Sequence, residues 1–209
     1  NLRVFCNLKT MSQGSELGMV LVISGPSGVG KDTVWKTAAS CLPSFSRAIT
    51  CTTRTRREHE VEGRDYYFVS QDEFERMIDE DELIEWARVH GNCYGIPQKS
   101  VFERINAGLD VVCVIDVQGA LRIRRIFPTA TLVFIKPPQG RESEVLATRI
   151  QSRSEVDPSE LQTRLQTATW EMSQVHLYDY EIVNDDLERA ANELCEVIAR
   201  EKERRLAPA

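Results

Sequence analysis

Residues 25–31 read Gly25-Pro26-Ser27-Gly28-Val29-Gly30-Lys31, a match to the pattern GxxxxGK directly after the apolar run 19–24. The glycines allow successive backbone N–H groups to turn inward on a phosphate, and the positive end of a following helix adds to the attraction. A preceding strand and a following helix are the context that makes this pattern specific. The stretch therefore predicts a phosphate-binding loop of the P-loop type, in which Lys31 spans the β- and γ-phosphates of a nucleotide.

The residue after the lysine departs from the pattern, which has Ser or Thr there to face Mg²⁺. This sequence has Asp32 followed by Thr33, so the hydroxyl is displaced by one position. We predict that Thr33 supplies the metal-facing oxygen, although the choice between Asp32 and Thr33 stays open. The residues predicted to bind the nucleotide donor, ATP, are Gly25, Pro26, Ser27, Gly28, Val29, Gly30, Lys31, Asp32 and Thr33.

Outward from the loop, short apolar runs alternate with longer stretches of helical period, which is typical of an α/β layer fold. The short runs are apolar enough to be buried on both faces of a parallel sheet. The predicted strands are residues 19–24, 48–51, 109–115, 130–135 and 180–183. The predicted helices are residues 31–41, 97–107, 118–125, 141–151, 158–175 and 186–204.

The segment of about 52–96 has a different sequence pattern, with many charges, which predicts short mixed strands and one helix at 71–80. We interpret it as a small α+β insert in a core formed by residues 19–51 and 97–205. Residues 1–18 are irregular and form an N-terminal arm in this interpretation. The arm is upstream translation, a trimmed transit peptide or a disordered segment, and the sequence leaves these alternatives open.

The composition is that of an ordinary globular protein, with 209 residues, 42% hydrophobic and 28% charged. The net charge of −6 argues against nucleic acid as a partner, and no apolar run approaches the roughly 20 residues that a membrane span requires. The six cysteines form no CxxC pair and the three histidines lie far apart, which favours reduced thiols and no structural zinc. We therefore expect a cytoplasmic monomer or homodimer, or an organellar matrix protein if a transit peptide has been removed.

Further short motifs follow the loop in a fixed order, at residues 50–57, 60–69, 83–87, 91–95, 115–119 and 183–186. In this order they resemble the guanylate kinase family over about residues 19–204. The resemblance implies a P-loop NTPase fold: a three-layer α/β/α core with a parallel sheet, a GMP-binding insert and a helical lid at about 150–160. It also implies transfer of the γ-phosphoryl group of ATP, bound with Mg²⁺, to GMP or dGMP.

The resemblance places the acceptor nucleotide at the insert. In the family, residues matching Arg54, Arg57, Tyr66 and Tyr94 bind the acceptor phosphate, which suits arginine forks and phenolic donors. A carboxylate such as Glu85 can accept from N1–H and the 2-amino group of guanine, and adenine offers no matching donor at N1. The residues predicted to bind GMP are Thr50, Arg54, Arg57, Tyr66, Glu85, Tyr94 and Ile96.

Two positions depart from the family at the guanine site. Ile96 stands where Ser or Thr is usual, and Val114 stands where a carboxylate is usual. Each lost neutral hydrogen bond costs roughly 0.5–1.5 kcal/mol, so guanine binding would be weakened and would depend on Glu85, Thr50 and backbone groups. The strictness of guanine specificity is therefore open at this point.

The resemblance also implies a set of catalytic cations: Lys31, Arg54, Arg149, Arg153 and Arg164. The last three lie on two predicted helices joined by a break at residues 154–158, and so could converge on one phosphate chain. Phosphoryl transfer depends on positioning and charge neutralisation, so no general base is required. For Arg164 the alternative is a surface ion pair with Glu160, four residues earlier.

Asp116 and Asn184 each have a structural alternative. Asp116 is predicted to face the metal together with Thr33, or else to cap the helix that begins near residue 118. The resemblance implies that Asn184 contacts the adenine of ATP, and the alternative is a turn-forming asparagine.

Two other functions remain as alternatives. A related kinase that phosphorylates ribose 1,5-bisphosphate also has Lys-Asp in its P-loop, but Glu85-Trp86 and residues 60–69 favour the guanylate type. A non-catalytic guanylate-kinase-like module would bind a phosphopeptide through the insert, but such modules typically have a degraded P-loop.

Overall fold

The structure is a computed structural model that describes residues 17–89, 91–152 and 157–206. Its centre is a five-stranded sheet with the order β2-β7-β1-β8-β9. The strands are β1 (Val20–Ser24), β2 (Phe45–Arg47), β7 (Asp110–Val114), β8 (Thr131–Lys136) and β9 (Tyr180–Val183). All neighbouring pairs are parallel, so the carboxyl ends of the strands meet at one edge.

Helices cover both faces of this sheet, which is why β1 is buried along its whole length. Leu21 and Ile23 face α1 (Lys31–Ala38), the short turn η2 (Ala39–Cys41) and α7 (Leu187–Leu206). Val20 and Val22 face α3 (Gln98–Asn106) and α4 (Val117–Ile126) on the opposite side. This alternation gives the three-layer α/β/α core that the sequence predicts.

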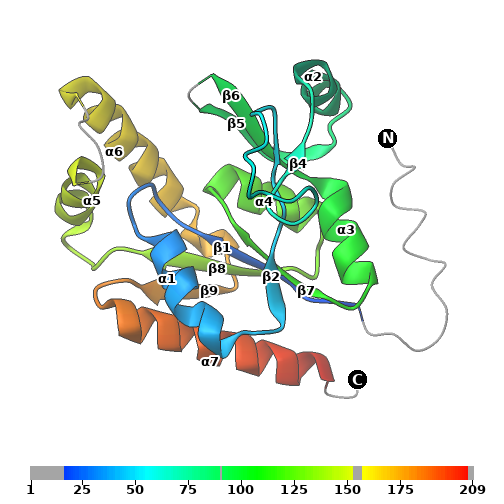
Figure 1. Ribbon diagram of the computed structural model, residues 1–209. Coiled ribbons are helices and arrows are strands. Elements are labelled where there is room, and N and C mark those ends of the chain that lie inside the picture. Colours follow the sequence, from blue (N-terminus) through cyan, green and yellow to red (C-terminus); the bar gives the residue numbers. More distant parts are fainter. Residues whose placement is uncertain (1–16, 90, 153–156, 207–209) are drawn as a thin grey trace.

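Two more helices, α5 (Glu142–Gln151) and α6 (Pro158–Ser173), pack against each other beyond the carboxyl edge of the sheet (Figure 1). The turn η3 (Val175–Leu177) then leads into β9. Asp157 accepts from the backbone N–H groups of Ser159 and Glu160, so it caps α6 where the helix begins. Residues 153–156 of the predicted lid, like residues 1–16 of the predicted arm, lie outside the described residues.

A second sheet, of four strands in the order β4-β3-β6-β5, lies beside the core and forms the upper lobe in Figure 1. Its strands are β3 (Cys51–Thr52), β4 (Tyr67–Phe68), β5 (Leu83–Val89) and β6 (Asn92–Pro97). Helix α2 (Gln71–Asp79) buries Phe74 and Met77 against it. The lobe corresponds in sequence to the predicted insert.

The predicted core strand 48–51 is wrong. The core strand is β2, three residues earlier, and Cys51 already belongs to the second sheet. Phe45 anchors β2 because its ring packs edge-on against Trp35 of α1, with 6.5 Å between centroids. Ala48 and Ile49 are buried where the chain crosses between the two sheets, so their hydrophobicity reflects this crossing and not a strand.

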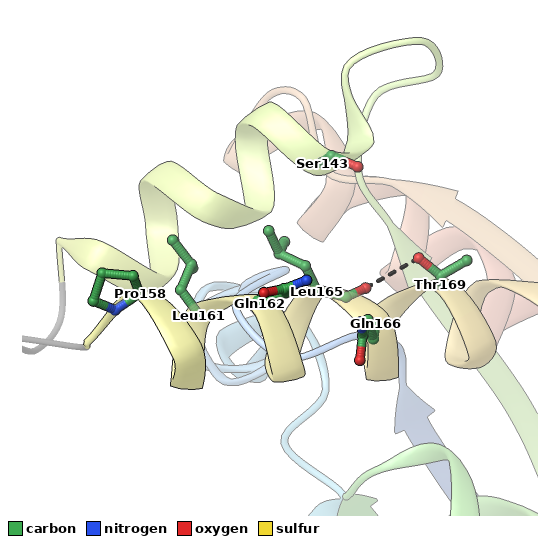
Figure 2. Close-up of a pocket in the computed structure, with 7 residues that line it drawn as sticks. All are labelled: Ser143, Pro158, Leu161, Gln162, Leu165, Gln166 and Thr169. Atoms are coloured by element: carbon green, nitrogen blue, oxygen red, sulfur yellow. Dashed lines mark hydrogen bonds between the residues drawn. The ribbon is translucent and has the colours of Figure 1, made fainter.

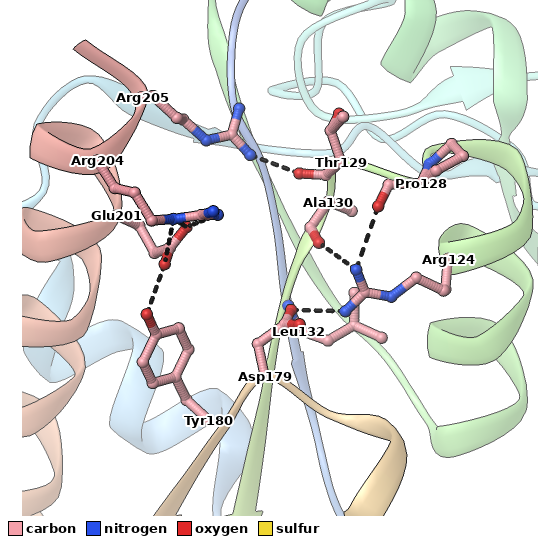
Figure 3. Close-up of polar contacts among 10 residues, drawn as sticks. All are labelled: Arg124, Pro128, Thr129, Ala130, Leu132, Asp179, Tyr180, Glu201, Arg204 and Arg205. Atoms are coloured by element: carbon pink, nitrogen blue, oxygen red, sulfur yellow. Dashed lines mark hydrogen bonds and ion pairs between the residues drawn. The ribbon is translucent and has the colours of Figure 1, made fainter. Parts of the chain in front are cut away.

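A polar network closes the amino-terminal edge of the core sheet, away from the phosphate-binding loop (Figure 3). Arg124 donates to Asp179 at 2.5 Å, and Glu201 accepts from Tyr180 and Arg204. The hollow beside these residues measures about 410 Å³. Because its charged groups are paired with one another, we interpret this edge as structural. In the described part of the chain, no helix has the length and apolar character needed to span a bilayer.

Candidate active site

The phosphate-binding loop has the backbone that its glycines permit. Gly25, Gly28 and Gly30 have φ values of 141°, 84° and 98°. A Cβ on Gly25 would lie 2.1 Å from the carbonyl oxygen of Ile135, so the loop passes against β8 at a distance that no side chain allows. Gly30 caps α1, so the amino-terminal end of this helix, with its positive dipole end, directly follows the loop.

Lys31 lies at the centre of a group of acidic side chains. Its ammonium donates to the carbonyl oxygens of Gly25 at 2.8 Å and Pro26 at 3.4 Å. Burial lowers the pKa of Lys31, and the carboxylates of Glu171, Asp32, Asp116 and Glu85 oppose this effect, Glu171 most strongly. The fold therefore brings residues of four separate segments to the end of β1.

Asn184 and Arg149 brace the other side of the loop. The side-chain amide of Asn184, which is 5% exposed, donates to the carbonyl oxygen of Val29 at 2.7 Å. Arg149 donates to the same carbonyl at 2.8 Å and to the backbone carbonyl of Asn184 at 3.0 Å. Both residues, predicted to contact ATP, thus also hold the loop from outside.

Glu85 reaches the same region from the second sheet. A Cβ on Gly119 would lie 2.7 Å from Oε2 of Glu85, so the carboxylate rests on the first turn of α4. Asp116 caps that helix, since its Oδ1 accepts from the Gly119 N–H at 2.8 Å. Burial, and secondarily the charge of Asp116, raises the pKa of Glu85 to about 7, while the Asp116 backbone N–H and Lys31 oppose the rise.

Arg54, Tyr66 and Tyr94 come together in the second lobe. The Arg54 guanidinium carbon lies 5.5 Å from the ring centroid of Tyr66, and the Tyr66 and Tyr94 centroids are 6.2 Å apart. Arg54 also pairs with buried Glu60 at 2.6 Å, and Glu60 accepts from the Arg57 backbone N–H at 2.8 Å. The hydrogen bond from the Arg54 guanidinium lowers the pKa of the Glu60 carboxyl. Glu60 thus organises the arginine turn, a role that the sequence analysis missed.

The other residues considered for the GMP site have less polar surroundings than Glu85 and Arg54. Thr50 is half-buried, and its carbonyl oxygen accepts from the Tyr67 N–H at 3.0 Å. Ile96 is 7% exposed and packs in the same hydrophobic cluster as Ile84. Val114 is half-buried and packs against the cluster on the opposite face of the core sheet. The Ile96 side chain is therefore a core side chain. Any contact to a ligand would come from its small exposed part or from its backbone.

Of the remaining predicted residues, Arg164 takes the surface ion pair given as its alternative. Arg164 pairs with Glu160 at 2.5 Å on the surface of α6. Asp32 is exposed and pairs with Arg47 at 2.8 Å. Thr33 is exposed in the first turn of α1. Arg153 lies outside the described residues. Within the described ranges, no three acidic, cysteine or histidine side chains gather closely enough to form a metal site by themselves.

Glu171 is a second residue that the sequence analysis missed. It is 5% exposed on α6, and its Oε2 accepts from the backbone N–H of Ser27 in the phosphate-binding loop at 3.3 Å. The available signal was an acid within the apolar stripe that Leu165 and Ala168 form along the helix. Such an acid needs a partner inside the protein, and the loop provides it.

The groove between α5 and α6 is separate from this site (Figure 2). It measures about 340 Å³ and extends along α6 from Pro158 to Thr169, whose hydroxyl donates back to the Leu165 carbonyl at 3.0 Å. None of the predicted site residues lines it. The residues that do are Ser143, Pro158, Leu161, Gln162, Leu165, Gln166 and Thr169.

The chain is similar to known proteins over most of its length. Residues 18–201 match the family model described as Guanylate kinase. A guanylate kinase of Gloeobacter violaceus is 46% identical over 85% of this chain and 85% of that protein. A guanylate kinase of Desulfitobacterium hafniense is 41% identical over 88% of this chain and 91% of that protein. The crystal structure of guanylate kinase from Anaplasma phagocytophilum matches 90% of this chain and 87% of its own, with 34% identity and a TM-score of 0.61.

Proposed function

Because the chain belongs to the guanylate kinase family, we propose that the residues assembled around Lys31 transfer the γ-phosphoryl group of ATP to GMP or dGMP. The products are ADP and GDP or dGDP. The observation that carries the proposal is the position of Glu85, whose carboxylate comes from the second lobe yet lies in the same charged group as Lys31. A residue suited to base recognition and a residue suited to phosphate binding thus lie within electrostatic reach of each other.

Glu85 selects the base. Its ionised carboxylate accepts from N1–H and the 2-amino group of guanine, two donors in a geometry that adenine lacks. With AMP, the half-buried carboxylate would lose its remaining water without gaining a partner, which costs about 1–3 kcal/mol. Thr50 and backbone groups supply the remaining polar contacts, because Ile96 and Val114 offer none from their side chains.

Arg54, Arg57, Tyr66 and Tyr94 bind the acceptor phosphate. Arg54 is held ready by Glu60 and by stacking near Tyr66, so little side-chain entropy is lost when the phosphate arrives. Its guanidinium has five N–H donors, and the contacts to Glu60 and the Thr55 carbonyl leave others for phosphate oxygens. The acceptor oxygen is largely deprotonated near pH 7, so this site needs no general base.

The donor is held by the loop. Backbone N–H groups of the loop, such as those of Gly28, Gly30 and Lys31, surround its phosphates, and the Lys31 ammonium spans the β- and γ-phosphates. Arg149, Arg153 and Arg164 add positive charge where it develops on the transferred group. Arg164 would exchange Glu160 for the phosphate, a small change since a surface ion pair contributes at most about 1 kcal/mol. Asn184 contacts the adenine beside its bond to the loop.

Magnesium fits the oxygen donors at this edge. Mg²⁺ prefers one or two protein oxygens together with substrate phosphates and water, and does not require a closed cage of ligands. Thr33 has an exposed hydroxyl, and Asp116 uses only Oδ1 for its helix cap. These two residues would hold the ion, which when bound neutralises charge on the β- and γ-phosphates.

The cell compartment and the oligomeric state are also proposals. The described cysteines all have free thiols, including buried Cys51 and Cys93, which favours a reducing compartment such as the cytoplasm. We propose a monomer or homodimer that acts on small molecules and not on nucleic acid.

The test of base selection is Glu85→Gln, with Glu103→Gln on the exposed side of α3 as the matched control. We expect the ratio of kcat/KM for GMP to that for AMP to fall by about 10–100-fold, since a hydrogen bond to a charged group contributes about 1.5–3 kcal/mol. The control should leave the ratio unchanged. An unchanged ratio in Glu85→Gln would remove Glu85 from the base site.

A further inference from the structure

We propose that Glu171 is a positioning residue for the donor site, which anchors α6 to the backbone of the phosphate-binding loop and so places the loop and Arg164 relative to each other. The inference rests on the proposed kinase function, because it assigns the loop to ATP. It concerns a residue of α6 that binds no substrate itself.

The contact between helix and loop is direct. Oε2 of Glu171 accepts from the Ser27 N–H at 3.3 Å. One turn earlier, Ala168 is buried in the same hydrophobic cluster as Val29 of the loop and Ile23 of β1. Ala168 and Glu171 are the buried residues of α6. The helix therefore docks through its carboxyl half, and the carboxylate is the polar part of that contact.

The energetics of burial indicate that this carboxylate serves the loop. A buried carboxylate without compensation costs several kcal/mol, and an apolar residue would pack α6 at lower cost. Within the described ranges, buried Glu60 and Glu201 each have an arginine partner, whereas Glu171 forms no ion pair. Its compensation is the Ser27 N–H and the nearby charge of Lys31.

The loop is thus held from two sides. Asn184 and Arg149 hold the Val29 carbonyl from one side, and Glu171 holds the Ser27 N–H from the other. The loop itself contributes a bond from the Val29 N–H to the Pro26 carbonyl at 3.2 Å. A loop fixed in this way before ATP arrives loses less conformational entropy on binding, so its affinity is higher.

The same anchor reaches Arg164. This arginine lies seven residues before Glu171 on one uninterrupted helix, so it is about two turns away. The outer half of α6 borders the groove of Figure 2 and lacks a buried side chain of its own. A displacement of Glu171 would therefore be transmitted along the helix to Arg164.

The experiment compares Glu171→Met, Glu171→Gln and the control Thr167→Ala, which changes an exposed residue one turn earlier. Met keeps the volume but cannot accept the Ser27 N–H effectively, so we expect an unchanged or higher Tm together with ATP binding weakened by about tenfold. Gln keeps an acceptor oxygen and should bind ATP within about threefold of the wild type. The KM for GMP should stay within about twofold in all three variants.

ATP binding is measured at equilibrium without an acceptor, so the result does not depend on GMP turnover. Wild-type ATP affinity in Glu171→Met would overturn the proposal, as would equal weakening of ATP and GMP with a lowered Tm, which indicates a purely structural role. If Glu171→Met does not fold, Glu171→Gln decides: loss of ATP binding despite its retained acceptor would contradict the anchor. Failure of the wild type to use GMP would instead overturn the proposed function and leave the binding result intact.

Discussion

Replacement of Gly119 by alanine should weaken recognition of guanine while it leaves the thermal stability of the protein nearly unchanged. Gly119 lies in the first turn of α4, and an added Cβ would meet Oε2 of Glu85 at 2.7 Å, Ile115 Cδ1 at 3.2 Å and Asp116 Oδ1 at 3.4 Å. The Glu85 contact is the shortest, and the Ile115 side chain would also have to give by a few tenths of an ångström. The carboxylate is the end of a flexible side chain, so it would move by roughly 0.7 Å to restore ordinary contact.

The expected magnitudes differ for the two properties. Alanine favours the helix over glycine by up to about 1 kcal/mol, which offsets the repacking of Glu85, so Tm should stay within about 4 °C of the wild type. A misplaced Glu85 loses a charged hydrogen bond to guanine worth about 1.5–3 kcal/mol, which lowers kcat/KM for GMP by about 10–100-fold. The rate with AMP should change little, since AMP makes no such bond.

The assay is coupled ADP release with GMP and AMP at fixed ATP, together with a thermal melt. Gln118→Ala, which changes the exposed neighbouring residue, is the control and should resemble the wild type. An unchanged GMP to AMP ratio in Gly119→Ala would refute the placement of Glu85 against α4 as the base reader. A large loss of Tm would show instead that Gly119 is required for the fold.

Three further predictions follow from the site. The pKa of Glu85 is raised to about 7, so its ionised form gains population as the pH rises, and the KM for GMP should fall between about pH 6 and 8, a trend that Glu85→Gln removes. The same raised pKa means that ionising Glu85 costs stability as the pH rises from about 4.5 to 7, so Glu85→Gln should gain Tm relative to the wild type above that range. Asn184→Ala removes the 2.7 Å brace on Val29 and should weaken ATP binding by about 5–10-fold in an equilibrium titration while the KM for GMP is retained.

Local sequence signals predicted the elements around the loop well. The glycine pattern fixed where β1 ends and α1 begins, and residues 180–183 form β9 with the predicted bounds. These features depend on short-range chemistry, in which glycine conformation and apolar runs suffice. The strand predicted at 48–51 failed because burial alone does not distinguish a strand from a crossing between two sheets.

The arrangement of the site was less accessible from sequence. Glu85 and Asp116 were both identified from the sequence. The close approach of the Glu85 carboxylate to Gly119, however, is a long-range contact that no local pattern encodes. Glu171 was overlooked because an acid on a helix usually faces solvent, and only the tertiary structure shows it buried against Ser27. Ile96 stays a predicted GMP contact, and the structure adds that its side chain packs in the same cluster as Ile84.

Acceptor specificity tests the account most directly. ADP release should be measured with ATP and Mg²⁺ and with GMP, dGMP, AMP, UMP and ribose 1,5-bisphosphate offered in parallel. We expect turnover with GMP and dGMP alone, because Glu85 lies close enough to Lys31 to interact with its charge and only guanine offers the carboxylate two donors. Turnover with ribose 1,5-bisphosphate or AMP, or no turnover with any acceptor, would contradict the assignment of this site to guanylate.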